Sequence, residues 1–216
     1  MLFKTENNHS KYLSSLFFVG FLYSPAAFAQ ELNCEHANQH HLKTVCSKQF
    51  TQERQQLNTS ALTAYLITDA PLRLVQDTNQ IWQNRLAQCK SYKCYKQQFE
   101  DRIEQLNFFT SINQSLTQHY LKYENGKLAS TPVHLKIHQL NKDNIKVEGI
   151  AYRNPNNKVE KQTIPFLAYS TTETKTDISN NESDCKYTFN YNKGYLKITT
   201  QQKNCDSFVG VYRLFD

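Results

Sequence analysis

Residues 72–89, LRLVQDTNQIWQNRLAQC, decide the fold of the first half of the chain. Their apolar positions recur at the i, i+3, i+4 and i+7 spacing that places side chains on one face of an α-helix. A second stripe of this kind follows after a break at residues 90–93, and it consists of Tyr95, Phe99, Ile103 and Leu106. The pattern predicts two amphipathic helices. The apolar face of the helix predicted within residues 72–89 is formed by Leu74, Val75, Thr78, Ile81, Trp82, Arg85, Leu86 and Cys89.

A looser helical stripe precedes this stretch. Pro71 is the only proline between residues 30 and 116, a region that also has no glycine. The residue before a proline avoids helical geometry, so we expect one long helix to end near Asp69. The stripe runs through Ala37, Leu42, Val45, Phe50, Leu57, Leu62 and Tyr65.

From about His119 the apolar period changes to two, which is typical of β-strands. Strands are expected around residues 133–137, 145–149, 159–169, 185–191, 195–200 and 208–215, with turns between them. The polar stretch 171–184 has no periodicity and is expected to be a long mobile loop. We therefore predict an α+β chain: a disulfide-stapled three-helix domain over residues 30–113, then a small antiparallel β-meander or barrel over residues 114–216.

The N-terminus has the features of a cleavable signal peptide over residues 1–29. Lys4 and Lys11 precede an apolar run at about residues 12–22, and the small-residue triplet 27–29, Ala-Phe-Ala, follows. The run is shorter than the roughly 20 residues of a membrane span. We expect a mature chain starting at Gln30, with no membrane span, in the periplasm or outside the cell.

The mature chain keeps six cysteines, an even number that suits an oxidising compartment. If Cys34 and Cys46 share one helix, about 1.5 Å per residue puts them about 18 Å apart, and a disulfide needs Cα atoms within about 7 Å. We therefore predict Cys46–Cys89 and Cys34–Cys94, with Cys34–Cys89 and Cys46–Cys94 as the alternative. Cys185 and Cys205 flank a predicted hairpin and are expected to bridge it.

A zinc site is the alternative use of these cysteines. Cys89 and Cys94 would act with His36, His40 or His41. The spacing lacks a Cys-x2-Cys knuckle, so no metal is expected. The histidines of the strand-rich half are interpreted as exposed side chains; they are His119, His134 and His138.

No enzyme signature is present. Only five glycines occur in the chain, and no two form a G-x-G pair, which excludes the dinucleotide-binding fingerprint and the P-loop. G-x-S-x-G and H-E-x-x-H are also absent. We expect neither catalysis nor a cofactor.

Residues 34–106 resemble the lysozyme inhibitor LprI-type N-terminal domain, a helical module of exported bacterial proteins. The resemblance rests on Trp82 seven residues before Cys89, on Cys94 five residues later, and on Arg102-Ile103-x-x-Leu106, with Cys34 and Cys46 matching the family's first cysteine pair. Departures are Tyr95 for Leu, Phe99 for Tyr, Asn79 for Gln, and Arg85 one position early.

The resemblance implies protein binding, with lysozyme or another peptidoglycan hydrolase as the inhibited partner. Basic lysozymes favour an acidic inhibitor. Residues 30–110, however, carry 9 basic and 8 acidic side chains, and residues 111–216 carry 14 and 10. Inhibition would therefore need a local acidic patch, for which Glu100, Asp101 and Glu104 are the candidates.

The alternative is a non-catalytic periplasmic binding or envelope-assembly module without inhibitory activity. The basic excess of the strand-rich half suits anionic envelope polymers, and export makes a nucleic-acid partner unexpected. The lysines named for this role are Lys136, Lys146, Lys186 and Lys197.

Overall fold

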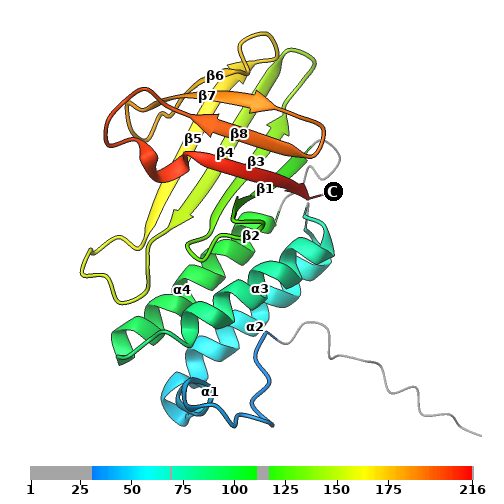
Figure 1. Ribbon diagram of the computed structural model, residues 1–216. Helices are drawn as coiled ribbons and strands as arrows, with labels where there is room; N and C mark the ends of the chain where they lie inside the picture. The colour runs from blue at the N-terminus through cyan, green and yellow to red at the C-terminus, as the bar shows by residue number, and fades with distance from the viewer. Residues whose placement is uncertain (1–30, 69, 111–116, 216) are drawn as a thin grey trace, which may run out of the picture.

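The computed structural model describes residues 31–68, 70–110 and 117–215. Helices occupy the N-terminal half and antiparallel strands the C-terminal half, so the predicted α+β class is confirmed (Figure 1). The predicted signal peptide lies outside the described residues. The helices are α1 His40–Val45, the 3-10 turn η2 Lys48–Phe50, α2 Thr51–Leu66, α3 Leu72–Leu86 and α4 Tyr92–Phe109.

The predicted stripe of α3 faces the core, where Leu74, Val75, Trp82 and Leu86 are buried. Their partners include Phe50 after α1, Leu57 of α2, and Phe99 and Leu106 of α4. A break between the two helices is confirmed, but it spans residues 87–91 rather than 90–93. Ser91 caps α4 by accepting a hydrogen bond from the Cys94 backbone N–H at 3.2 Å, so Tyr92 and Lys93 already belong to the helix. Two helices thus form where the spacing predicted them.

The single long helix expected before residue 69 is wrong. Residues 31–39 are irregular, and helix α1 ends at Val45 before the chain turns into η2 and α2. The guanidinium of Arg54 donates to the Val45 and Ser47 carbonyls at 2.6 and 2.7 Å and so holds the end of α1 against the start of η2. A side chain from the following helix therefore stabilises the interruption.

The break also corrects the two predicted disulfides of the helical half. Cys34 pairs with Cys46 and Cys89 pairs with Cys94, with Cα–Cα distances of 5.6 and 5.5 Å. The 18 Å separation does not apply, because Cys34 precedes α1 and the chain folds back. Cys185–Cys205 is confirmed. The zinc alternative is excluded for these cysteines because all six form disulfides, and the described residues contain no group of three or more His, Cys, Asp or Glu side chains that could hold a metal ion.

The strands form one antiparallel sheet of order β5-β4-β3-β1-β9-β8-β7-β6, with β2 paired to β1. The sheet curls until its two edge strands approach each other. There the backbone N–H of Leu167 donates to Asn180 Oδ1 at 3.0 Å, and the N–H of Asn181 donates to the Leu167 carbonyl at 2.7 Å. The result is a nearly closed barrel. Its strands are β1 Thr117–Glu124, β2 Lys127–Leu128, β3 Val133–Gln139, β4 Asn144–Tyr152, β5 Thr163–Thr171, β6 Asp177–Ser179, β7 Lys186–Tyr191, β8 Tyr195–Thr199 and β9 Gly210–Phe215.

The stretch 171–184, expected to be a loop throughout, contains β6 and the seam residue Asn180. Ile178 of β6 is buried in the barrel, and Asn180 is 4% exposed. A strand of three residues is too short for an alternating pattern to be recognisable in the sequence. The pairing of β6 with β7 and the seam contacts of Asn180 order this segment, together with local turns such as the hydrogen bond between Thr171 and Thr174.

The helices cover one outer side of the barrel (Figure 1). β3 is therefore buried on both faces: Leu135 points into the barrel, whereas His134 and Lys136 lie on the outer face, against the end of α4. Leu121 of β1 and Phe215 of β9 join the core of the helical half. The two halves thus share a core, and their predicted boundary falls in residues 111–116, outside the described part. No described helix has the length and apolar character needed to cross a bilayer.

Candidate functional site

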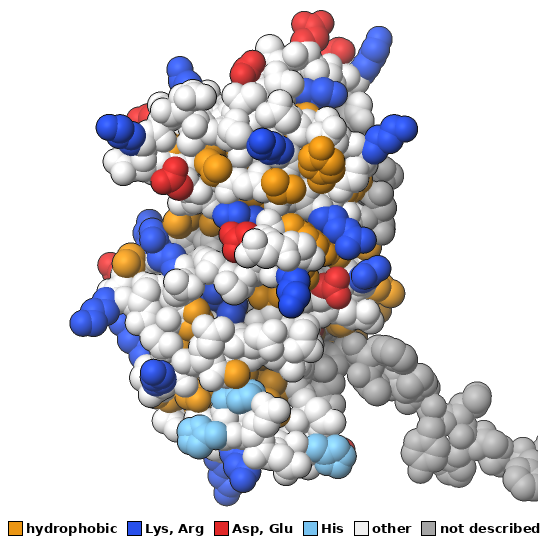
Figure 2. Space-filling model, in the orientation of Figure 1, with side chains coloured by type: hydrophobic (Ala, Val, Ile, Leu, Met, Phe, Trp, Pro, Cys, Tyr) orange, Lys and Arg blue, Asp and Glu red, His pale blue; other side chains and the backbone are white. Residues whose placement is uncertain are grey.

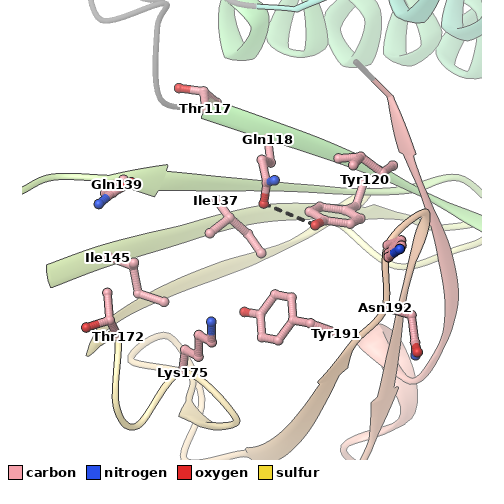
Figure 3. Close-up of a pocket in the computed structure, with 12 residues that line it drawn as sticks. Thr117, Gln118, Tyr120, Ile137, Gln139, Ile145, Thr172, Lys175, Tyr191 and Asn192 are labelled. Atoms are coloured by element: carbon pink, nitrogen blue, oxygen red, sulfur yellow. Dashed lines mark hydrogen bonds between the residues drawn. The ribbon is translucent and has the colours of Figure 1, made fainter. Parts of the chain in front are cut away.

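One mouth of the barrel opens into a cavity of about 570 Å³ (Figure 3). This volume lies within the range of small-ligand sites. Strand ends and two connections build it, the β5–β6 loop and the β7–β8 turn. The described lining residues are Thr117, Gln118, Tyr120, Ile137, Gln139, Ile145, Thr172, Lys175, Tyr191, Asn192, Lys193 and Leu214.

The charge of the barrel mouth is positive. Lys175 comes from the β5–β6 loop and Lys193 from the β7–β8 turn, and both side chains are exposed. None of the described lining residues is Asp or Glu, although Glu173 belongs to the same loop as Lys175. The Lys175 ammonium lies 5.6 Å from the centroid of the Tyr191 ring, within cation–π range. An anion entering the mouth meets two cations.

Two tyrosines flank the inner part of the mouth. The Tyr120 hydroxyl donates to Gln118 Oε1 at 3.1 Å (Figure 3). The Tyr191 hydroxyl is buried and has no hydrogen-bond partner among the described residues. Burial, followed by the neighbouring Tyr120, raises the pKa of Tyr191, so this phenol is neutral and keeps its proton to donate.

The residues singled out by the family resemblance lie elsewhere, in the core of the helical half. Trp82 is 3% exposed and donates its indole N–H to the Gln98 carbonyl at 2.6 Å. Arg102 is fully buried and pairs with Glu31 at 2.8 Å. Leu106 is buried and Ile103 partly buried in the same core.

The three side chains of the predicted acidic patch do not share one exposed face of α4. Asp101 is 3% exposed and pairs with Arg85 at 3.6 Å, whereas Glu100 and Glu104 are exposed. Burial raises the pKa of Asp101, and hydrogen bonds from Gln97 and Gln98 together with the Arg85 charge oppose that rise. Only Glu100 and Glu104 are therefore available to a partner.

The prediction of exposed histidines is wrong for His119 and His134, which are each 1% exposed. They lie under α4 because the helical layer covers the outer face of β1 and β3. His138 is partly buried, and its Nε2 lies 2.8 Å from Glu148 Oε2. That hydrogen bond is the largest cause that lowers the pKa of Glu148 to about 2, and Lys146 adds to it.

The other histidines and the lysines were also expected to be exposed, and only some of them are. Histidine side chains lie at the surface near the α1 end, and basic side chains are scattered over the visible face (Figure 2). Of the lysines considered for envelope polymers, Lys186 and Lys197 are exposed. Lys146 pairs with Glu148 at 2.7 Å, and Lys136 is buried and donates to the Phe108 carbonyl at 2.6 Å. The helical layer is what removes Lys136 from the surface.

Sequence reasoning did not find the barrel mouth. Lys175 falls in the stretch expected to be a loop, and Lys193 in a hairpin turn. The sequence shows only a lysine in each of two connections between strands. Nothing in the sequence indicates that these two connections lie at the same end of the barrel. No family model, no curated protein and no solved structure matches this chain. The LprI-type resemblance therefore stays a prediction.

Proposed function

We propose that this chain is an exported, non-catalytic binding protein whose barrel mouth holds a small anionic ligand of the cell envelope. The observation that carries the proposal is the cavity of about 570 Å³ with Lys175 and Lys193 at its edge and no described acidic lining residue. Three disulfides indicate a compartment outside the cytoplasm. The signal-like N-terminus supports the periplasm, or secretion, as that location.

The test uses the oxidised mature chain and a panel of three anions: digalacturonate, laurate and the tripeptide triglutamate. Amide resonances are followed by two-dimensional NMR during titration. At least one anion is expected to shift amides of Thr172, Asn192 and Lys193 and to leave the Trp82 indole N–H, in the helical layer, unmoved. Failure of all three anions to shift the mouth amides at millimolar concentration would contradict the proposal.

A matched pair of variants separates local recognition from net charge. Lys175→Gln with Lys193→Gln removes two positive charges from the mouth, and we expect it to weaken binding at least tenfold. Lys43→Gln with Lys48→Gln removes two exposed charges from the helical half. This control is expected to bind like the unmodified protein, and equal weakening in both variants would show only long-range attraction.

Inhibition of a cell-wall hydrolase is the second candidate function. The observation that favours it is the pair of exposed carboxylates, Glu100 and Glu104, one turn apart on α4. The test is titration of c-, g- and phage-type lysozymes with the oxidised protein. The variant Glu100→Gln with Glu104→Gln should lose inhibition, whereas Glu160→Gln with Glu182→Gln, at two exposed acids of the barrel, should keep it. Full lysozyme turnover at a large molar excess of the protein would remove this candidate.

A further inference from the structure

The inner limit of the barrel mouth restricts the length of its ligand. Along a strand, residues two positions apart share a face. Four of the strands contribute a lining residue whose next neighbour on the same face lies deeper in the barrel. The lining residues are Ile137, Ile145, Tyr191 and Leu214, and the deeper neighbour is 0% exposed in each case. These deeper neighbours are Leu135, Val147, Phe189 and Tyr212.

These buried side chains fill the barrel beneath the mouth. They belong to the barrel core, where the centroid of the Phe166 ring lies 6.1 Å from that of Phe189 in a tilted arrangement and 5.0 Å from that of Phe208 in an edge-to-face one. A long acyl chain needs a deep apolar channel, and the core leaves none below the cavity in the described barrel. The ligand must be short.

The wall of the mouth is suited to hydroxyl groups. The side-chain amides of Gln139 and Asn192 come from β3 and the β7–β8 turn, are exposed, and make no side-chain hydrogen bond to a described residue. Figure 3 places them on opposite sides of the cavity, with Lys175 and Tyr191 between them. An amide group offers both a donor and an acceptor, as adjacent sugar hydroxyls require.

The apolar part of the lining joins three aliphatic side chains, Ile137, Ile145 and Leu214, to the two tyrosine rings described above. Ile137 of β3 and Ile145 of β4 are diagonal neighbours, since Ile137 pairs with Val147, and both side chains line the cavity (Figure 3). A sugar ring carries C–H groups that pack on such a surface while its hydroxyls reach the amides. The combination of amides, a short aliphatic wall and two lysines matches a polar ring with a carboxylate better than a hydrocarbon.

We infer that the barrel mouth binds a short acidic saccharide, with its carboxylate at Lys175 and Lys193, its hydroxyls at Gln139 and Asn192, and its ring on Ile137 and Ile145. This inference rests on the proposed function, since it names the ligand class of the same site. It distinguishes the saccharide from the two other anions, which share only the negative charge.

The experiment compares digalacturonate with laurate, triglutamate and lactose, a neutral disaccharide, by NMR titration of the oxidised mature chain. Digalacturonate is expected to bind at the mouth at least tenfold more tightly than each of the others. Gln139→Leu should weaken digalacturonate binding three- to tenfold and leave the unfolding midpoint unchanged. A matched control is Gln201→Leu, since Gln201 is exposed and absent from the lining of the mouth.

The possible failures are distinguishable. Tighter mouth binding of laurate or triglutamate overturns the saccharide assignment and keeps the proposed anion site. Equal binding of lactose and digalacturonate overturns the role of the lysines in saccharide recognition. Absence of mouth binding by every probe overturns both proposals together.

Discussion

The Nδ1 atom of His119 lies 3.0 Å from the Nε2 atom of His134, and both rings are buried between α4 and the outer face of β1 and β3. The rings of Phe108 and Phe109 pack on His134 at 5.0 and 5.1 Å, and the Lys136 ammonium lies on the same face. A charged imidazole is disfavoured here by burial and by the neighbouring lysine.

We expect the free energy of unfolding to fall in mild acid because of the buried His134 ring. Burial, then His119 and Lys136, lowers the pKa of His134 well below its usual 6.5. The unfolded chain thus binds a proton at a higher pH than the folded protein does. The contribution of neutral His134 to stability is complete above about pH 6.5 and is lost as the pH falls below it, by up to about 1.4 kcal/mol per pH unit.

Urea unfolding between pH 4.5 and 8 measures this effect. His134→Gln should flatten the pH dependence of the free energy of unfolding, whereas His36→Gln, at an exposed site, should leave it unchanged. NMR titration of the unmodified protein provides a second readout, in which the His134 ring should stay neutral well below pH 6.5. An ordinary titration of that ring near pH 6.5 would falsify the prediction.

Replacing Arg102 should be strongly destabilising. Its guanidinium bonds Glu31 at 2.8 and 2.9 Å and also donates to Thr78 Oγ1 and Gln105 Oε1 at 3.0 and 2.6 Å. Arg102→Met leaves the Glu31 carboxylate buried without its cation, at a cost of about 3–5 kcal/mol. Denaturant unfolding measures the change.

Two further variants test the cause of that loss. Glu31→Gln combined with Arg102→Met should recover part of the stability, because the uncompensated charge is gone. Arg73→Met breaks the exposed pair with Asp77 at 3.7 Å and should cost under about 1 kcal/mol. If Arg102→Met and Arg73→Met lowered the free energy of unfolding equally, burial of the Arg102–Glu31 pair would not explain the loss.

Gly149 is predicted to tolerate no side chain. A Cβ at this position would lie 2.5 Å from Leu135 Cδ2, 3.0 Å from Phe166 Cβ and 3.2 Å from the His134 carbonyl oxygen. Gly149→Ala should therefore destabilise the barrel by about 1–3 kcal/mol. Gly194→Ala, where a Cβ meets nothing within 4 Å, is the control and should change the unfolding midpoint little.

Disulfide mapping checks the corrected pairing. Proteolysis of the non-reduced protein should yield linked peptides for Cys34–Cys46, Cys89–Cys94 and Cys185–Cys205. Replacing both Cys185 and Cys205 by Ala should lower the free energy of unfolding by about 2–4 kcal/mol, because the unfolded chain loses a closed loop. Peptides joining Cys46 to Cys89 or Cys94 would instead restore one of the pairings expected from the sequence.

Local patterns were sufficient to predict the fold class. The stripe that contains Trp82 predicted a buried helix face, and the alternation around Leu135 predicted a strand with one face in a core. Both patterns depend only on residues close in sequence, because the helical period and the strand period are properties of the backbone. The bridge between Cys185 and Cys205 was also predictable, since a hairpin turn between them brings its arms together.

The sequence by itself thus determined the helical and strand-rich halves and the bridge across the hairpin. Only the tertiary structure decided that Cys34 pairs with Cys46, that His119 and His134 are buried, and that Lys175 and Lys193 share one mouth. Each of these depends on where the chain folds back or where one layer covers another. Such contacts join residues far apart in sequence, and no local period records them.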